Sequence, residues 1–198
     1  MKTKIFGVFA GVALLCSCVP SVNPFYTEKD VVTDPRLPGV WQEADKKDDP
    51  QVWKFEAAET NAYQVTFTED HGKTGVFCGH LFKLGGEHFL DLIPANCDYA
   101  TNQAGLVGVA MIPGHLLVRV SAFEPSLQLA FCNGDWLKKF LETNSTAIAH
   151  NHEKDSLVLT ADTAALQKFV LQHLGKDELF GDAGEFIRQT NRVPAAAK

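Results

Sequence analysis

Apolar and polar residues alternate with a period of two along much of the chain, which is the pattern of half-buried β-strands. Trp53 and Phe55 alternate with charged residues, and Tyr63, Val65 and Phe67 alternate with polar residues. Stretches rich in Asp, Gly and Pro separate these runs and supply turn residues. The pattern predicts a mainly β (α+β) fold, an antiparallel meander or barrel of about eight strands.

The clearest local element is a β-hairpin over residues 74–93, centred on Gly85 and Gly86. Two glycines can supply the positive φ angles that a two-residue hairpin turn requires. A turn at these positions sets one register, because a slip of one residue would move every side chain to the other face. The register places three cross-strand pairs on one face: Cys78 with Ile93, His80 with Asp91, and Phe82 with Phe89.

Two stretches change to a helical period. Asp135 can cap a short helix over residues 136–141, and Asp162 can cap a longer helix that ends at Gly175. The remaining strands are expected at residues 115–123, 127–131, 156–160 and 185–189. Residues 95–113 have no consistent period, and one further strand is expected there at 106–112. The fold class is therefore β-rich with two short helices.

The N-terminus has the organisation of a bacterial lipoprotein signal. Lys2 and Lys4 precede an apolar run from Ile5 to Leu15, which is too short to span a bilayer. Lipoprotein processing favours Leu three positions before the modified Cys and a small residue directly before it. Leu15 and Ser17 meet both requirements for Cys18, which is therefore the expected lipidation residue, with Cys16 as the alternative.

This signal implies a domain organisation. Residues 1–17 are the expected signal peptide, and residues 18–35, which contain three prolines among polar residues, are the expected lipidated tether. A single β-rich domain is expected over 36–190, followed by a disordered tail at 191–198. The expected address is the cell envelope as a membrane-anchored lipoprotein. In a Gram-negative cell it is the outer membrane, because Val19 is not acidic.

Charge restricts the classes of partner. Removal of residues 1–17 takes away two lysines and no acidic residue, so the net charge changes from −6 to −8. An acidic domain of this kind does not attract nucleic acid, and it does not adhere to anionic lipid by charge. The acyl chains on Cys18 would have to hold the protein at the membrane.

Three cysteines remain besides Cys18 after processing, namely Cys78, Cys97 and Cys132. Disulfides can persist in an exported compartment, but an odd number leaves one thiol unpaired. A Cys78–Cys97 bridge and a set of buried free thiols both fit the spacing.

Several polar residues interrupt the apolar strands and are candidate site residues. Cys78, His80 and Asp91 have the composition of a nucleophile, base and orienting acid. Parallel projection of Cys78 and His80 from one strand instead favours a structural His80–Asp91 hydrogen bond. His150 and His152 are expected in a solvated loop, without a third metal ligand at a suitable spacing. We therefore expect no catalytic residues, no metal site and no cofactor.

Gly39-Val40-Trp41 stands at the start of the first strand, and the chain closes with an amphipathic helix, an order that resembles lipocalin-like barrels. The resemblance implies that an arginine near the last strand packs on Trp41, and Arg188 is the best-placed residue for this role. Three stretches, at residues 23–30, 80–86 and 89–92, also resemble a group of uncharacterised bacterial lipoproteins. That second resemblance carries no activity.

The lipocalin-like resemblance implies a binder of a small apolar or lipid ligand. The aromatic residues expected to line the ligand site are Trp41, Phe55, Tyr63, Phe67, Phe82 and Phe89. The alternative is a non-enzymatic envelope accessory protein that binds a protein partner through its outer surface or the Trp136 helix. Small barrels can be filled by their own side chains, so the packing of the interior distinguishes the two functions.

Overall fold

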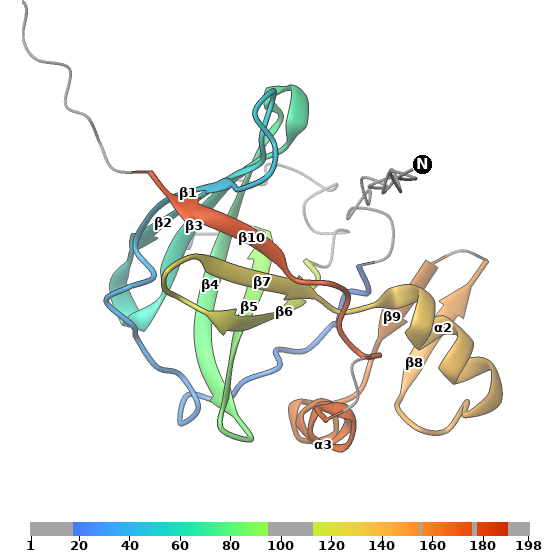
Figure 1. Cartoon of the computed structure of the whole chain (residues 1–198). Coiled ribbons are helices and arrows are strands. Elements are labelled where there is room, and N and C mark those ends of the chain that lie inside the picture. Colours follow the sequence, from blue (N-terminus) through green and yellow to red (C-terminus); the bar gives the residue numbers. More distant parts are fainter. Residues whose placement is uncertain (1–17, 95–112, 155, 176–177, 190–198) are drawn as a thin grey trace, which may run out of the picture.

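The computed structural model describes residues 18–94, 113–154, 156–175 and 178–189. Eight antiparallel strands form a closed barrel in the order β1-β10-β7-β6-β5-β4-β3-β2 (Figure 1). The barrel strands are β1 (Gly39–Glu43), β2 (Val52–Ala57), β3 (Tyr63–Thr68), β4 (Thr74–Leu84), β5 (Glu87–Pro94), β6 (Leu116–Ala122), β7 (Leu127–Phe131) and β10 (Gly184–Arg188). This lipocalin-like meander, closed by the pairing of β1 with β10, confirms the predicted fold class.

A second layer is inserted between β7 and β10. It consists of helix α2 (Gly134–Thr143), a hairpin of β8 (His150–Glu153) and β9 (Ser156–Leu159), and helix α3 (Thr163–His173). These elements lie together on one side of the barrel in Figure 1. Two short 3₁₀ turns, η1 (Glu59–Asn61) and η2 (Asp70–Gly72), lie in barrel loops.

Both helices begin at a side-chain cap. The Asp162 carboxylate accepts a hydrogen bond from the Ala165 backbone N–H at 2.8 Å, as predicted for the longer helix. The cap of α2 is Asn133, whose side chain accepts from the Trp136 N–H at 3.0 Å, so the prediction of Asp135 was wrong. Asp135 lies in the first turn, where its charge complements the helix dipole.

The β4–β5 hairpin has the predicted turn and register. Gly85 and Gly86 have φ angles of 61° and 88°, a region that favours glycine. The three pairs predicted for this hairpin are present: Cys78 with Ile93, His80 with Asp91, and Phe82 with Phe89. The glycine pair therefore fixes which side chains of β4 and β5 share a face.

Two hydrophobic cores lie on opposite faces of the barrel wall. Leu81 and Leu90 belong to the interior core, whereas the next residues on the same strands, Phe82 and Phe89, belong to a core between the barrel and the second layer. The separation follows from the strand period, since successive side chains point to opposite faces. The outer core includes residues of α2, α3 and β9 together with Val19 and Phe25.

The N-terminal segment (residues 18–38) is packed on the domain, so the prediction of a tether over 18–35 was wrong. Val19 and Phe25 are buried in the outer core, and Ser21 forms bridges to His115 and Leu159. Val31 forms a further bridge to Phe82. Proline and polar residues suggested a linker, but the apolar residues between them are anchored by backbone hydrogen bonds that composition does not reveal.

The remaining predictions concern the histidines at 150 and 152 and the segments outside the described residues. His150 and His152 lie on strand β8 and not in a loop. The signal peptide at 1–17, the strand at 106–112 and the tail at 191–198 fall outside the described residues. In the part of the chain that the structure describes, no helix combines the length and apolar character needed to cross a membrane.

Candidate functional site

One end of the barrel is closed by Trp41 and Arg188. Trp41 is 1% exposed, and its indole N–H donates to the Leu37 carbonyl at 2.9 Å. The Arg188 guanidinium carbon lies 4.1 Å from the centroid of the Trp41 ring, a cation–π contact. The same guanidinium donates to the carbonyls of Pro38, at 2.7 Å, and Arg36. Arg188 therefore occupies the position that the lipocalin-like resemblance implied.

Gly39 completes this closure. Its φ angle is 145°, and a Cβ atom there would overlap the Arg188 guanidinium. A side chain at position 39 would displace the cation from the Trp41 ring. The Gly-x-Trp triplet thus has a physical reason here, since glycine leaves room for the arginine that covers the tryptophan.

The six aromatic residues predicted to line a ligand site do not share one cavity. Trp41, Phe55, Tyr63 and Phe67 belong to the interior core, whereas Phe82 and Phe89 face the second layer. The prediction for the last two was wrong because Leu81 and Leu90 take the inward positions of β4 and β5. Phe82 and Phe89 stack on each other with centroids 5.5 Å apart.

Buried apolar side chains of the eight strands meet in a core inside the barrel. Among its buried apolar residues the most exposed is Phe67, at 7%. The interior core contains these buried residues: Trp41, Trp53, Phe55, Tyr63, Val65, Phe67, Leu81, Leu90, Leu92, Val118, Val120, Leu127, Leu129 and Phe186. A pocket for a drug-sized ligand would leave several of its lining side chains accessible. These residues pack into one core, and Phe77, Leu116 and Phe131, which are only partly buried, pack against it.

One polar atom in this core is unsatisfied. Among the described residues, the Trp53 indole N–H is the one buried side-chain nitrogen or oxygen without a hydrogen-bond partner. Aromatic rings lie around the Trp53 ring, whose centroid is 4.3 Å from that of Phe67 and 6.1 Å from those of Phe55 and Phe131. A buried donor without an acceptor costs about 1–3 kcal/mol.

The two interior tryptophans provide a matched test. Trp41→Phe and Trp53→Phe remove the same atoms, but only the first breaks a hydrogen bond, and it leaves the Leu37 carbonyl without its donor. Trp41→Phe should therefore lower the free energy of unfolding by about 1–3 kcal/mol more than Trp53→Phe does. Chemical denaturation of both variants measures the difference, and equal losses would contradict the assignment of the two N–H groups.

Outside the barrel, Asp91 is the centre of a buried polar network. Its carboxylate is 1% exposed and accepts hydrogen bonds from the Phe25 backbone N–H at 2.8 Å and from His115 Nδ1 at 2.6 Å. A buried carboxylate needs such partners because its desolvation is costly. The network fastens the N-terminal segment and the residue before β6 to the middle of β5.

His80 lies opposite Asp91 in the register, but its hydrogen bond goes elsewhere. Its Nδ1 atom lies 3.0 Å from the Tyr26 hydroxyl, and the two rings stack with centroids 4.6 Å apart. Burial lowers the pKa of His80, against a weaker opposite effect of Asp91. Burial and the charge of Asp91 raise the pKa of Tyr26 to about 12. In place of the predicted His80–Asp91 hydrogen bond, His80 bonds to Tyr26, and Asp91 bonds to Phe25 and His115.

The cysteines separate into two groups. Cys78 is disulfide-bonded, so it supplies no thiolate for the nucleophile set considered from the sequence. Its predicted partner, Cys97, lies outside the described residues. Cys18 and Cys132 are free, and they are close enough for Cys18 to add to the effect of burial, which raises the pKa of Cys132 to about 12.

The Cys132 thiol should resist alkylation in the folded protein. At pH 8 its thiolate is about a thousandfold rarer than that of a thiol with the ordinary pKa of 9.0, and the side chain is buried. Intact mass after iodoacetamide treatment should show no adduct on Cys132 until denaturant is added. Stoichiometric labelling of the native protein within minutes would show that the side chain is accessible.

The two β8 histidines have different surroundings. His150 Nδ1 lies 2.9 Å from the Ile148 carbonyl, and His152 is exposed. Over the described ranges, no group of three or more His, Cys, Asp or Glu side chains is placed to hold a metal ion.

Comparisons of the chain with protein-family models, with curated proteins and with solved structures found no match.

Proposed function

We propose that the protein is a lipid-anchored envelope lipoprotein that acts as a non-enzymatic accessory protein and binds a protein partner through its outer surface. The packing of the interior core favours this function over that of a carrier for a small ligand. Fourteen buried apolar side chains of the barrel strands form the interior core, and the partly buried Phe77, Leu116 and Phe131 pack against it. The barrel is then a rigid scaffold, and its outer face makes the functional contacts.

The anchor rests on the processing signal. Leu15 and Ser17 precede Cys18 in the pattern of lipoprotein cleavage, and the apolar run before them has signal-peptide length. In a Gram-negative host the outer membrane is the proposed destination. Two or more acyl chains give stable membrane attachment without help from the acidic domain.

The outer surface offers only small apolar features. In the described part of the chain three large apolar side chains are exposed: Val22, Leu171 on α3 and Ile187 on β10. Trp136 and Phe140 of α2 pack against His173, with ring centroids 5.5 and 5.1 Å away, so much of this aromatic face is used within the fold. A surface of this kind suits a polar, reversible protein contact better than an obligate apolar one.

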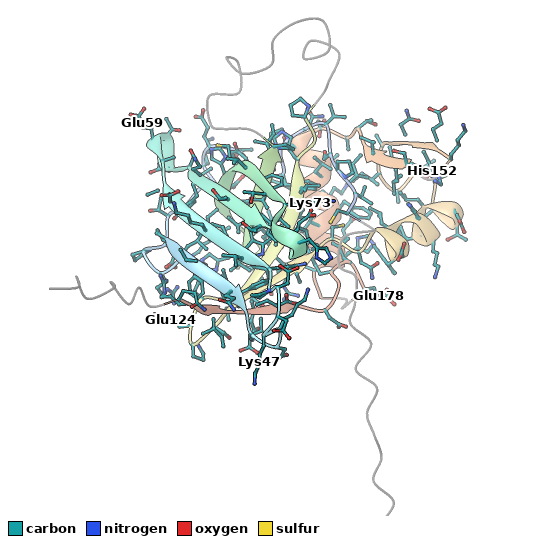
Figure 2. The ribbon with its side chains drawn as sticks, turned by 90° about the horizontal axis from the view of Figure 1, so that it is seen from above. Lys47, Glu59, Lys73, Glu124, His152 and Glu178 are labelled. Atoms are coloured by element: carbon teal, nitrogen blue, oxygen red, sulfur yellow. The ribbon has the colours of Figure 1, made fainter. Side chains whose placement is uncertain are left out.

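Site-specific photo-crosslinking in the native envelope tests partner binding. A photoreactive residue is placed at Leu171 on α3, at Ile187 on β10, at His152 on β8 or at Glu59 in η1, so that separate elements are sampled. His152 and Glu59 lie on opposite sides of the molecule in Figure 2. A bound partner predicts one discrete adduct from one or two of these positions and none from the rest. Failure of all four positions to give a discrete adduct would contradict the proposal.

A second candidate, a carrier of a small apolar ligand, is favoured by the unpartnered Trp53 N–H. A ligand with one acceptor atom would satisfy that donor and would sit among the surrounding aromatic rings. Titration with a fluorescent fatty acid separates the candidates. The filled barrel predicts no saturable binding, whereas a carrier predicts saturable binding that Trp53→Phe weakens and Trp41→Phe preserves.

A further inference from the structure

We propose that the folded domain lies directly on the membrane surface, with the start of the N-terminal segment facing the lipid, and is not held away from it by a spacer. This inference rests on the proposed anchor at Cys18. The proposed binding partner of this part of the domain is the lipid surface.

Backbone hydrogen bonds fix the chain three residues after the anchor. Ser21 donates to the His115 carbonyl at 2.9 Å and accepts from the His115 N–H at 2.8 Å. The next contacts join the segment to β9, where the Leu159 N–H donates to Pro20 and the Val22 N–H donates to Leu159, both at 2.9 Å. The segment is thus held between the residue before β6 and the end of β9.

The distance from anchor to domain is therefore short. Only Val19 and Pro20 separate Cys18 from Ser21, and a fully extended chain spans at most about 3.6 Å per residue, or about 11 Å over these three steps. Val19 is 3% exposed, so it is already part of the outer core. Cys18 itself is partly buried. Acyl chains on Cys18 would leave the protein from the body of the domain.

The chemistry of this segment suits a lipid surface. Residues 19–27 contain no charged side chain, and the first charges along the chain are Glu28 and Lys29. Val22 is 38% exposed, one of three large apolar side chains exposed among the described residues. An acidic domain would otherwise avoid anionic headgroups, so an uncharged stretch beside the anchor lowers the cost of close approach.

A fluorescence-quenching experiment on the acylated protein in liposomes tests the contact. An environment-sensitive dye is attached to Val22→Cys or, as the control, to Glu59→Cys, both in a Cys132→Ala background. Labelling of that background alone measures any reaction at other thiols. Glu59 lies in the β2–β3 loop, across the molecule from the β8 residue His152, as Figure 2 shows, and β9, the partner of β8, binds the N-terminal segment.

With a quencher attached near the lipid headgroups, the dye at position 22 should be quenched at least threefold more strongly than the dye at position 59. Insertion of a 12-residue Ser/Gly spacer between Cys18 and Val19 adds a flexible link of about 19 Å r.m.s. length and should remove most of that difference. Equal quenching at the two positions, or no effect of the spacer, would overturn the inference.

Mass spectrometry of the N-terminal peptide from the same preparation tests the proposed anchor separately from the membrane contact. An N-terminal peptide without acyl chains on Cys18 would defeat the anchor and the membrane contact together. An acylated Cys18 combined with equal quenching at both positions would keep the anchor and defeat only the direct contact.

Discussion

Replacing Trp41 with alanine should lower the free energy of unfolding by about 3–5 kcal/mol, the usual cost of removing a large aromatic side chain from a core. The change removes the hydrogen bond to Leu37 and leaves the Arg188 guanidinium without the ring that it covers. The residues around Trp41 are parts of closed strands, so they cannot collapse easily into the space. Urea denaturation followed by circular dichroism measures the loss.

Ile187→Ala is the matched control for Trp41→Ala. Ile187 is next to Arg188 on β10 but is 50% exposed, so its truncation should change stability by no more than about 0.5 kcal/mol. A loss below about 1.5 kcal/mol for Trp41→Ala would mean that the closed end of the barrel is less well packed than the structure indicates.

Replacing Asp91 with alanine should cost a similar amount, about 3–5 kcal/mol, because it breaks a buried and fully hydrogen-bonded carboxylate interaction. The variant leaves the Phe25 N–H and His115 Nδ1 without their acceptor in a buried site. The N-terminal segment should detach before the barrel unfolds, since Asp91 holds it at Phe25. Hydrogen exchange of residues 19–26 would report this local opening at low denaturant.

Two further variants serve as controls for Asp91→Ala. Asp91→Asn keeps one acceptor oxygen and the side-chain shape, so it should be less destabilising than Asp91→Ala. Asp48→Ala removes an exposed carboxylate from the β1–β2 loop and should leave stability almost unchanged. Wild-type exchange rates at residues 19–26 in Asp91→Ala would contradict the proposed fastening of the segment.

Much of the barrel could be predicted because its determinants are local. The alternation of Tyr63, Val65 and Phe67 identifies a half-buried strand, and Gly85-Gly86 alone sets the β4–β5 register. The expected contact between Trp41 and Arg188 depends on closure of the barrel by its first and last strands. The lipocalin-like resemblance, and not the strand pattern, was the basis for expecting that contact.

The features that were missed depend on contacts between distant segments. Alternation shows that Phe82 and Phe89 share a face, but it does not show which face is the interior when a second layer buries the other one. His115 lies within hydrogen-bond distance of Asp91 because β5 pairs with β6. The N-terminal segment has the composition of a linker, and its burial depends on Leu159, which lies more than 130 residues away along the chain.

Native mass spectrometry of the full-length protein, extracted gently from the membranes of its own host, tests the central claim most directly. The account predicts one species that begins at Cys18, carries covalent acyl chains on that residue and has no additional non-covalent mass in the barrel. A chain that begins elsewhere without acylation would contradict the anchor. A stoichiometric apolar ligand retained after removal of detergent would contradict the filled barrel.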